Sequence, residues 1–436
     1  MHDDRGFSNA DLSPGGREWM AMLRAPSDAP LPRSWWYDTS TLVIADATLA
    51  EQVLRTPRGV FVLPSRFYLD TDNSSSEQRS STELPPGQAT VQSWMTPAWA
   101  PAAVRELAPK MLAAADQALD VDPPDSSRWP ALEGALELSS RLAALLCLGP
   151  DADLVAGLHP AIRAATPGVV RGVGQSGDPD AKVRFARAAA EIGSRVQSAV
   201  DRRSKDGEFD GADLLSTLLA AANKRGQTDL RSVVFAVAHA LWRVETGPGL
   251  VTAWMLHELA GSPGHQAQIR EQAVAVLGGE GIPAAINPAD LTFASQAMRE
   301  ALRLHPTSWI QGWVACEEVD IGDHHLMPGM QVRIAVYPIQ RDQANYPDPD
   351  TFRPDRWADP ALAGPSNAFL PFSMGPSYCK GTHWVHAIAT LSTAAILRRY
   401  HLTRSPGTQV TPKFTSHLEP VGLFLDTASV PAGARP

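Results

Sequence analysis

Residues 372–381 read FSMGPSYCKG, and this stretch decides how the rest of the chain is interpreted. It holds Cys379, one of three cysteines among 436 residues, between Gly375 and Gly381. The residues that follow, THWVHAIATLSTAAILRRY, have a helical pattern, so Cys379 is expected just before a helix N-terminus. Unpaired backbone N–H groups at such a terminus favour a thiolate over a thiol.

The residues of this loop leave two interpretations open. A lone cysteine is most often a buried structural residue, and Cys379 taken alone would be one. The loop also suits a thiolate that binds haem iron as its axial ligand. Gly375 permits a tight turn, Gly381 leaves room for a flat group beside the backbone, and Phe372 supplies an aromatic wall.

Composition restricts the class of protein. The net charge is −9 and no long basic run occurs, so nucleic acid is not expected as a partner. Three cysteines do not make a disulfide framework, and we find no signal-peptide pattern and no apolar run long enough to span a membrane. We therefore expect a cytoplasmic protein with no membrane association, with disordered ends at 1–16 and 430–436 around a single domain at 17–429.

Periodicity predicts a mainly α fold with small β-sheets. The expected helices span 101–119, 131–148, 180–204, 211–224, 229–261, 264–278, 290–304 and 382–400. The expected strands lie near 41–45, 58–62, 313–321 and 331–336, with a late hairpin at 401–426.

The segment Thr228–Gly261 is long enough, at about 50 Å if helical, to cross a whole domain. It contains Gly247-Pro248-Gly249, and proline removes a backbone donor while glycine lowers helix propensity. A kink or local opening is expected there. The alternative is a loop that joins two shorter helices.

Two further motifs stand in order before the cysteine loop. Glu300 and Arg303 in EALR are three residues apart and share a helix face, and YPDPDTFRPDRW then supplies Arg356. These motifs and FSMGPSYCKG together resemble the cytochrome P450 family. The resemblance implies a single triangular-prism domain that binds haem b through Cys379. It also implies a buried ionic cluster of Glu300, Arg303 and Arg356 behind the haem.

The central segment departs from the pattern of that family, which has two small residues, an acid and a threonine above the haem. Matching LWRVETGPG by identity makes Glu245 and Thr246 the proton-delivery pair. A match without gaps instead puts Gly247 at the threonine position. In either register bulky residues enter the substrate pocket, which we expect to include Trp242, Arg243 and Gly247. The gapless register is similar to the branch of prostacyclin synthase and the bile-acid sterol hydroxylases, which includes both an oxygenase and an isomerase.

The positions that usually bind the haem propionates with arginine or histidine also differ. The residues found at these cofactor-binding positions are Gln88, Gln92, Trp313 and Ser377. Because each charge-assisted hydrogen bond is worth about 1.5–3 kcal/mol, their loss would weaken haem binding. Arg105 or Arg333 is a candidate to compensate.

The resemblance implies a haem-thiolate monooxygenase of secondary metabolism. Twelve tryptophans hint at a bulky apolar substrate such as a terpenoid, steroid or polyketide. Electrons would come from a separate ferredoxin and ferredoxin reductase. Two alternatives stay open: a redox-independent isomerase or cyclase on the same fold, and a haem-free auxiliary protein.

Overall fold

A computed structural model describes residues 32–62, 91, 93–121, 127–158, 160–161, 181–207, 209–278, 281–414 and 417–430. The predicted disordered ends lie outside these ranges apart from Val430, and so do Gln88 and Gln92. Within the described ranges no helix combines the length and the apolar character needed to cross a bilayer.

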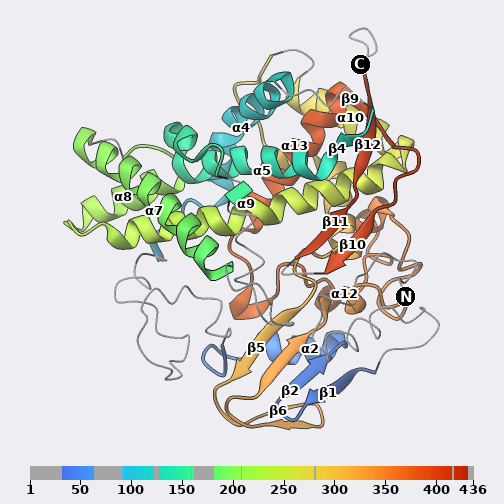
Figure 1. Ribbon diagram of the computed structural model, residues 1–436. Coiled ribbons are helices and arrows are strands. Elements are labelled where there is room, and N and C mark those ends of the chain that lie inside the picture. Colours follow the sequence, from blue (N-terminus) through green and yellow to red (C-terminus); the bar gives the residue numbers. More distant parts are fainter. Residues whose placement is uncertain are drawn as a thin grey trace.

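Helices dominate the fold, as the periodicity predicts, and they gather in one half of the molecule (Figure 1). The main helices are α2 (Ala47–Arg55), α4 (Pro101–Val121), α5 (Ala131–Leu148), α7 (Ala181–Asp206), α8 (Leu214–Lys224), α9 (Arg231–Ala260), α10 (Pro263–Leu277), α11 (Thr292–Leu304), α12 (Val336–Ile339) and α13 (Thr382–Arg399). Short 3₁₀ turns η3 (Gly149–Val155), η5 (Pro288–Asp290), η6 (Pro354–Ala358), η7 (Ser366–Ala368) and η8 (Gly375–Ser377) connect them.

Helix α9 is the longest and spans about 45 Å. It continues through Pro248, so the alternative of two helices joined by a loop is wrong, and so is the expected local opening. Glycines on both sides of Pro248 have no side chains to crowd its ring. The Pro248 carbonyl also accepts a hydrogen bond from Thr252 Oγ1 at 3.0 Å.

The opposite half holds a five-stranded sheet in the order β1-β2-β8-β5-β3 (Figure 1). Only the β2–β8 pair is parallel. Its strands are β1 (Ser34–Asp38), β2 (Thr41–Ile44), β3 (Phe61–Val62), β5 (Gln311–Ala315) and β8 (Gln331–Ile334). A three-stranded sheet, β4-β12-β9, joins Trp129–Pro130, Phe424–Ser429 and Tyr400–Arg404, and two hairpins pair β6 (Val319–Ile321) with β7 (His324–Leu326) and β10 (Thr411–Phe414) with β11 (Leu418–Val421).

Several predicted elements have different limits. The strand expected near 58–62 covers only Phe61–Val62, and the one expected at 331–336 ends at Ile334. The strand expected at 313–321 divides into β5 and β6, because residues 316–318 are exposed and the two strands enter different sheets. The helix expected from 290 begins at Thr292, since the Asn287 side chain first caps the 3₁₀ turn η5.

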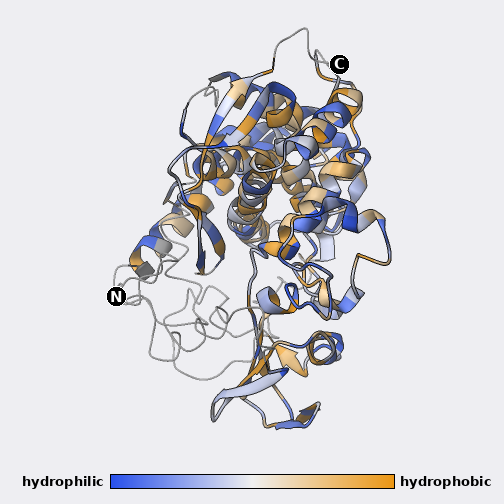
Figure 2. Ribbon diagram, turned by 90° about the vertical axis from the view of Figure 1, so that its right-hand side faces the viewer, coloured by the Kyte–Doolittle hydropathy of each residue, from blue (hydrophilic) through white to orange (hydrophobic). Residues whose placement is uncertain are grey.

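The helical core centres on α13 and α5. From Ala387 to Arg398 every residue of α13 is buried, which identifies it as an internal helix rather than a surface helix. Other helices mix hydrophobic and hydrophilic residues along their length, as expected for elements with one exposed side (Figure 2). A second apolar cluster lies between α2 and the five-stranded sheet and includes Trp313 and Leu370.

A buried ionic cluster that the sequence did not predict ties α7 to the start of α8. Arg203 is 2% exposed, and its guanidinium contacts Asp151 at 2.5 Å and Asp213 at 3.0 Å. Asp213 is also the N-cap of α8, where its side chain accepts from Ser216 N. The three residues belong to separate segments, so no local pattern marks them.

Two glycines of α9 provide a matched test of this packing. A Cβ on Gly249 would lie 2.9 Å from the Cα of Leu136 in α5, whereas a Cβ on Gly247 would meet nothing within 4 Å. Gly249→Ala should therefore lower the free energy of unfolding by about 1–3 kcal/mol through overpacking. Gly247→Ala should raise it by up to about 1 kcal/mol through helix propensity. Urea unfolding followed by circular dichroism measures both, and equal effects would contradict the close α5–α9 contact.

Candidate functional site

The cysteine loop lies between η8 and α13. Cys379 is exposed, and its backbone N–H donates to the Phe372 carbonyl at 2.9 Å, which closes the loop. Gly381 is the N-cap of α13, and Thr382 Oγ1 donates to the Cys379 carbonyl at 2.6 Å. The thiol therefore sits directly before the first turn of a buried helix.

Each glycine of the loop has a different spatial role. Gly375 has φ of +60°, and a Cβ there would lie 2.5 Å from the Leu54 carbonyl oxygen of α2, so a side chain is excluded. At Gly381 a Cβ would make ordinary van der Waals contacts, 3.8 Å from Cys379 Sγ and 3.6 Å from the Trp99 ring. The backbone beside the sulfur therefore packs near an aromatic ring.

The side chains around the sulfur are partly aromatic. Phe372 is half-buried against the helical core, and Ser377 is exposed. Trp99 packs on Trp384 of α13 with ring centroids 4.2 Å apart, and Trp384 Nε1 donates to the Ala98 carbonyl at 2.8 Å. These contacts fix the Trp99 ring beside Gly381.

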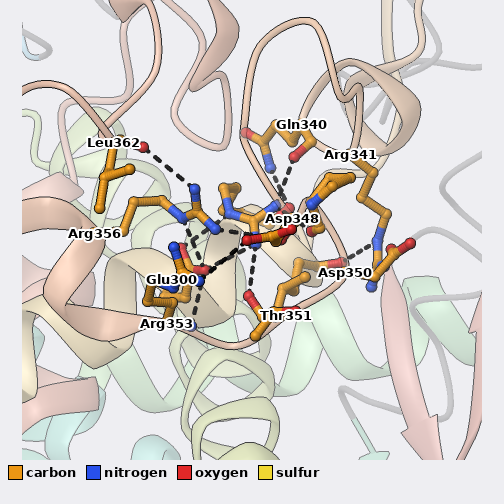
Figure 3. Close-up of polar contacts among 12 residues, drawn as sticks. Glu300, Gln340, Arg341, Asp348, Asp350, Thr351, Arg353, Arg356 and Leu362 are labelled. Carbon is orange, nitrogen blue, oxygen red and sulfur yellow. Dashed lines mark hydrogen bonds and ion pairs between the residues drawn. The ribbon is translucent and has the colours of Figure 1, made fainter.

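The structure brings Glu300, Arg303 and Arg356 together, and all three side chains are fully buried. Figure 3 shows Glu300 beside Arg356 within the network of polar contacts. Glu300 Oε1 lies 2.8 Å from Arg303 Nη2 and 3.2 Å from Arg356 Nε. Glu300 also accepts from Trp357 Nε1 at 3.0 Å and from Arg353 N at 3.1 Å. Glu300 and the two arginines together carry a net positive charge. Arg303 also donates hydrogen bonds to the carbonyl oxygens of Gln340 and Pro349, and these partial negative charges stabilise the excess positive charge.

Hydrogen bonds connect this cluster to the cysteine loop. Gln340 donates to the carbonyls of Leu302 and Arg303 in α11, and its Oε1 accepts from Leu370 N at 2.8 Å. Gln311 of β5 donates to the Leu370 carbonyl at 2.9 Å. Since Leu370 precedes Phe372 by two residues, the position of the loop depends on α11 and on the sheet.

Helix α9 places the predicted pocket residues on different sides. Arg243 is exposed and Trp242 is half-buried, while Val244 and Thr246 are buried. Gly247 borders open space. The side chain of Glu245 is outside the described part of the chain. Among the described residues Gly247 borders open space, whereas Thr246 is buried; which of the two registers applies above the haem stays a prediction.

Strands β5 and β8 hold a buried cation, Arg333. Gly312 pairs with Arg333, whose guanidinium fills the space above the glycine: a Cβ on Gly312 would lie 1.8 Å from Arg333 Nη1. Arg333 is 9% exposed. Trp313 Nε1 is a buried donor with no acceptor among the described residues. Gly312 and Trp313 are consecutive residues of β5, so Trp313 lies on the face of the sheet opposite to Arg333. Arg333 Nη2 donates to Gln331 Oε1 at 2.6 Å.

A second polar cluster, which sequence reasoning missed, lies near the C-terminal half of α9. The His305 ring stacks on Trp254 with centroids 3.8 Å apart, and His305 Nε2 lies 2.6 Å from Glu258 Oε1. Burial lowers the pKa of His305 to about 4, although Glu258 opposes this effect. The contact is therefore a hydrogen bond from a neutral imidazole at pH 7. Its residues come from α9 and from the end of α11, so no local pattern in the sequence marks the cluster.

Comparisons with known proteins agree with this geometry. The cytochrome P450 family model matches residues 201–427. The chain is 32% identical over 237 residues to cyclooctatin synthase of Streptomyces melanosporofaciens, covering 53% of this chain and 50% of that protein. It is 29% identical over 237 residues to pentalenene oxygenase of Streptomyces avermitilis, covering 53% and 52%. It is also 29% identical over 226 residues to taurochenodeoxycholic 6 alpha-hydroxylase of Sus scrofa, covering 48% and 43%.

The chain belongs to the cytochrome P450 family, whose cofactor is haem b. The chain spans about half the length of the curated relatives it matches. The matched half contains α9, the ionic cluster and the cysteine loop. These are the elements on which the sequence resemblance was based.

Removing one arginine from the buried ionic cluster should lower the free energy of unfolding. Arg356→Ala leaves a buried carboxylate with fewer partners and should lower the free energy of unfolding by about 3–5 kcal/mol. Arg141→Ala is the control, because Arg141 pairs with Glu137 at the surface and such pairs contribute about 0–1 kcal/mol. Urea unfolding at equal haem content gives both values, and similar losses would contradict a role for the buried cluster.

Proposed function

We propose that this protein is a haem-thiolate monooxygenase that oxidises a bulky apolar molecule of terpenoid type. The observation that carries the proposal is the exposed Cys379 thiol beside Gly381 and the Trp99 ring. These residues fit haem b, because a cysteine thiolate binds haem iron and the Trp99 ring offers an apolar surface beside it. Two relatives, pentalenene oxygenase and cyclooctatin synthase, are named for terpenoid compounds, which supports a terpenoid-like substrate.

Each part of the site has a proposed role in this chemistry. Cys379 would hold the haem iron through its thiolate, and the bound haem would supply an iron centre at which a thiolate ligand favours cleavage of the O–O bond. Phe372, Gly375, Gly381 and Ser377 shape the loop around the sulfur. On α9, Glu245 and Thr246 are the candidates for proton delivery, and Trp242, Arg243 and Gly247 for the substrate pocket. Electrons come from a separate ferredoxin and its reductase.

The haem propionates need a cation, and we assign this role to Arg333. The Arg333 guanidinium occupies the place that a side chain of residue 312 would fill, so the cation comes from β8 instead of β5. Arg105, the other candidate, is exposed on α4. Gln88 and Gln92 remain candidates outside the described residues.

A redox-independent isomerase or cyclase is the second candidate function. It is favoured by the burial of Thr246, since the open space beside α9 is bordered by Gly247, which has no hydroxyl for proton delivery. The two functions differ in their need for electrons. Turnover that continues when ferredoxin, reductase and reduced nicotinamide are withheld would favour the isomerase.

The spectrum of the purified protein tests the proposed function. The reduced, carbon-monoxide-bound protein should show the Soret band of a thiolate ligand, and Cys379→Ala should remove it while circular dichroism stays unchanged. Cys316→Ala, which changes an exposed cysteine outside the loop, is the matched control. A protein that stays colourless when haem is supplied would instead be an auxiliary protein, and a thiolate band in Cys379→Ala would disprove the ligand assignment.

Haem retention tests the assignment of Arg333. Arg333→Gln should accelerate haem transfer to excess apomyoglobin by about 10-fold or more, since a charge-assisted bond is worth about 1.5–3 kcal/mol. Arg105→Gln should leave the transfer rate unchanged. Adding Gly312→Arg to Arg333→Gln should restore retention, because the new arginine enters the space that the old one left. Equal transfer rates in all variants would refute the assignment.

A further inference from the structure

One face of α9 borders open space among the described residues. His239, Arg243 and Gly247 follow one another at intervals of four residues and therefore share this face. No described atom lies within 4 Å of a Cβ built on Gly247, and Arg243, one turn away, is exposed. The other side of the helix is closed by the contact of Gly249 with α5.

The hairpin β10–β11 packs along the same face. Trp254 comes eleven residues after Arg243, which returns it to the same side of the helix within about 20°. Its Nε1 donates to the Leu418 carbonyl of β11 at 3.0 Å, and this bond places the neighbouring His417 beside α9. Phe414 of β10 packs edge-on against Trp309 and Tyr337 and forms an apolar wall.

The charge on this face is that of one arginine. Burial and, to a smaller extent, the positive charge of Arg243 lower the pKa of His239 and of His417 to about 4. Both imidazoles are therefore neutral at pH 7, and their nitrogens can donate or accept hydrogen bonds. One cation with two neutral imidazoles matches a group with a single negative charge, whereas a diphosphate would keep an excess of negative charge.

We propose that Arg243, His239 and His417 bind the carboxylate of the substrate, so that the substrate is an apolar carboxylic acid whose hydrocarbon part extends past Gly247. Arg243 supplies the charge, and its guanidinium can donate two parallel hydrogen bonds to a carboxylate. The inference rests on the proposed function for the place of the substrate. It goes beyond that function because it assigns the substrate a charged group and names the residues that recognise it.

Paired ligands test this proposal. Dehydroabietic, lithocholic and palmitic acids are each compared with their methyl esters, which keep the carbon skeleton but lack the charge. Dissociation constants come from quenching of tryptophan fluorescence and, separately, from the shift of the Soret band. In the unmodified protein at least one acid should bind 10-fold or more tightly than its ester. Arg243→Gln should abolish that preference by weakening the acid alone, and Arg243→Lys should keep part of it.

Arg231→Gln is the control, because Arg231 begins the same helix and pairs with Asp229 at the surface. It should leave the preference for the acid unchanged. The proposal is overturned if no acid is preferred over its ester, including the case in which nothing binds, or if Arg243→Gln weakens both equally. A normal haem spectrum without acid preference would reject this inference but not the proposed function. If fluorescence shows that the acid is preferred in a protein without the thiolate band, the proposed function is rejected and this inference is kept.

Discussion

The structure depends on one buried carboxylate. Glu300 is fully inaccessible to solvent, and its oxygens accept hydrogen bonds from Arg303, Arg356, Trp357 and the backbone N–H of Arg353. A charge removed from water is tolerated only when its partners are complete, so these segments must meet in one arrangement. Gln340 then extends the arrangement to Leu370, just before the cysteine loop. The position of Cys379 thus follows from an ion pair far away in sequence.

The same contacts separate a rigid side of the site from a variable one. The cysteine loop is closed by hydrogen bonds, by the Gly375–Leu54 approach and by the buried helix α13. The opposite side is formed by α9 and the hairpin β10–β11, where Arg243 and Gly247 leave space and charge exposed. This division suits a family in which the thiolate chemistry is shared and the substrate differs, since a fold fixes the first and local side chains fix the second.

Periodicity predicted most helices to within a few residues, because α4, α5, α7, α8 and α13 carry long apolar patterns that must face a core. It failed where a local feature interrupts the pattern, as at residues 316–318, where one expected strand becomes two. It also gave too much weight to Gly247-Pro248-Gly249. Packing on α5 keeps α9 continuous there, and intrinsic propensity is weaker than such tertiary contacts.

The sequence by itself determined the family and the order of the motifs, since Glu300, Arg303, Arg356 and Cys379 lie in short segments with recognisable spacing. Only the tertiary structure decided which residues share the site. Arg333 lies over Gly312 because β8 pairs with β5, and His417 reaches α9 because Trp254 holds β11. The buried cluster of Arg203 with Asp151 and Asp213 arose in the same way. Pairings between distant segments are set by the summed packing of the chain, and no local spacing records them.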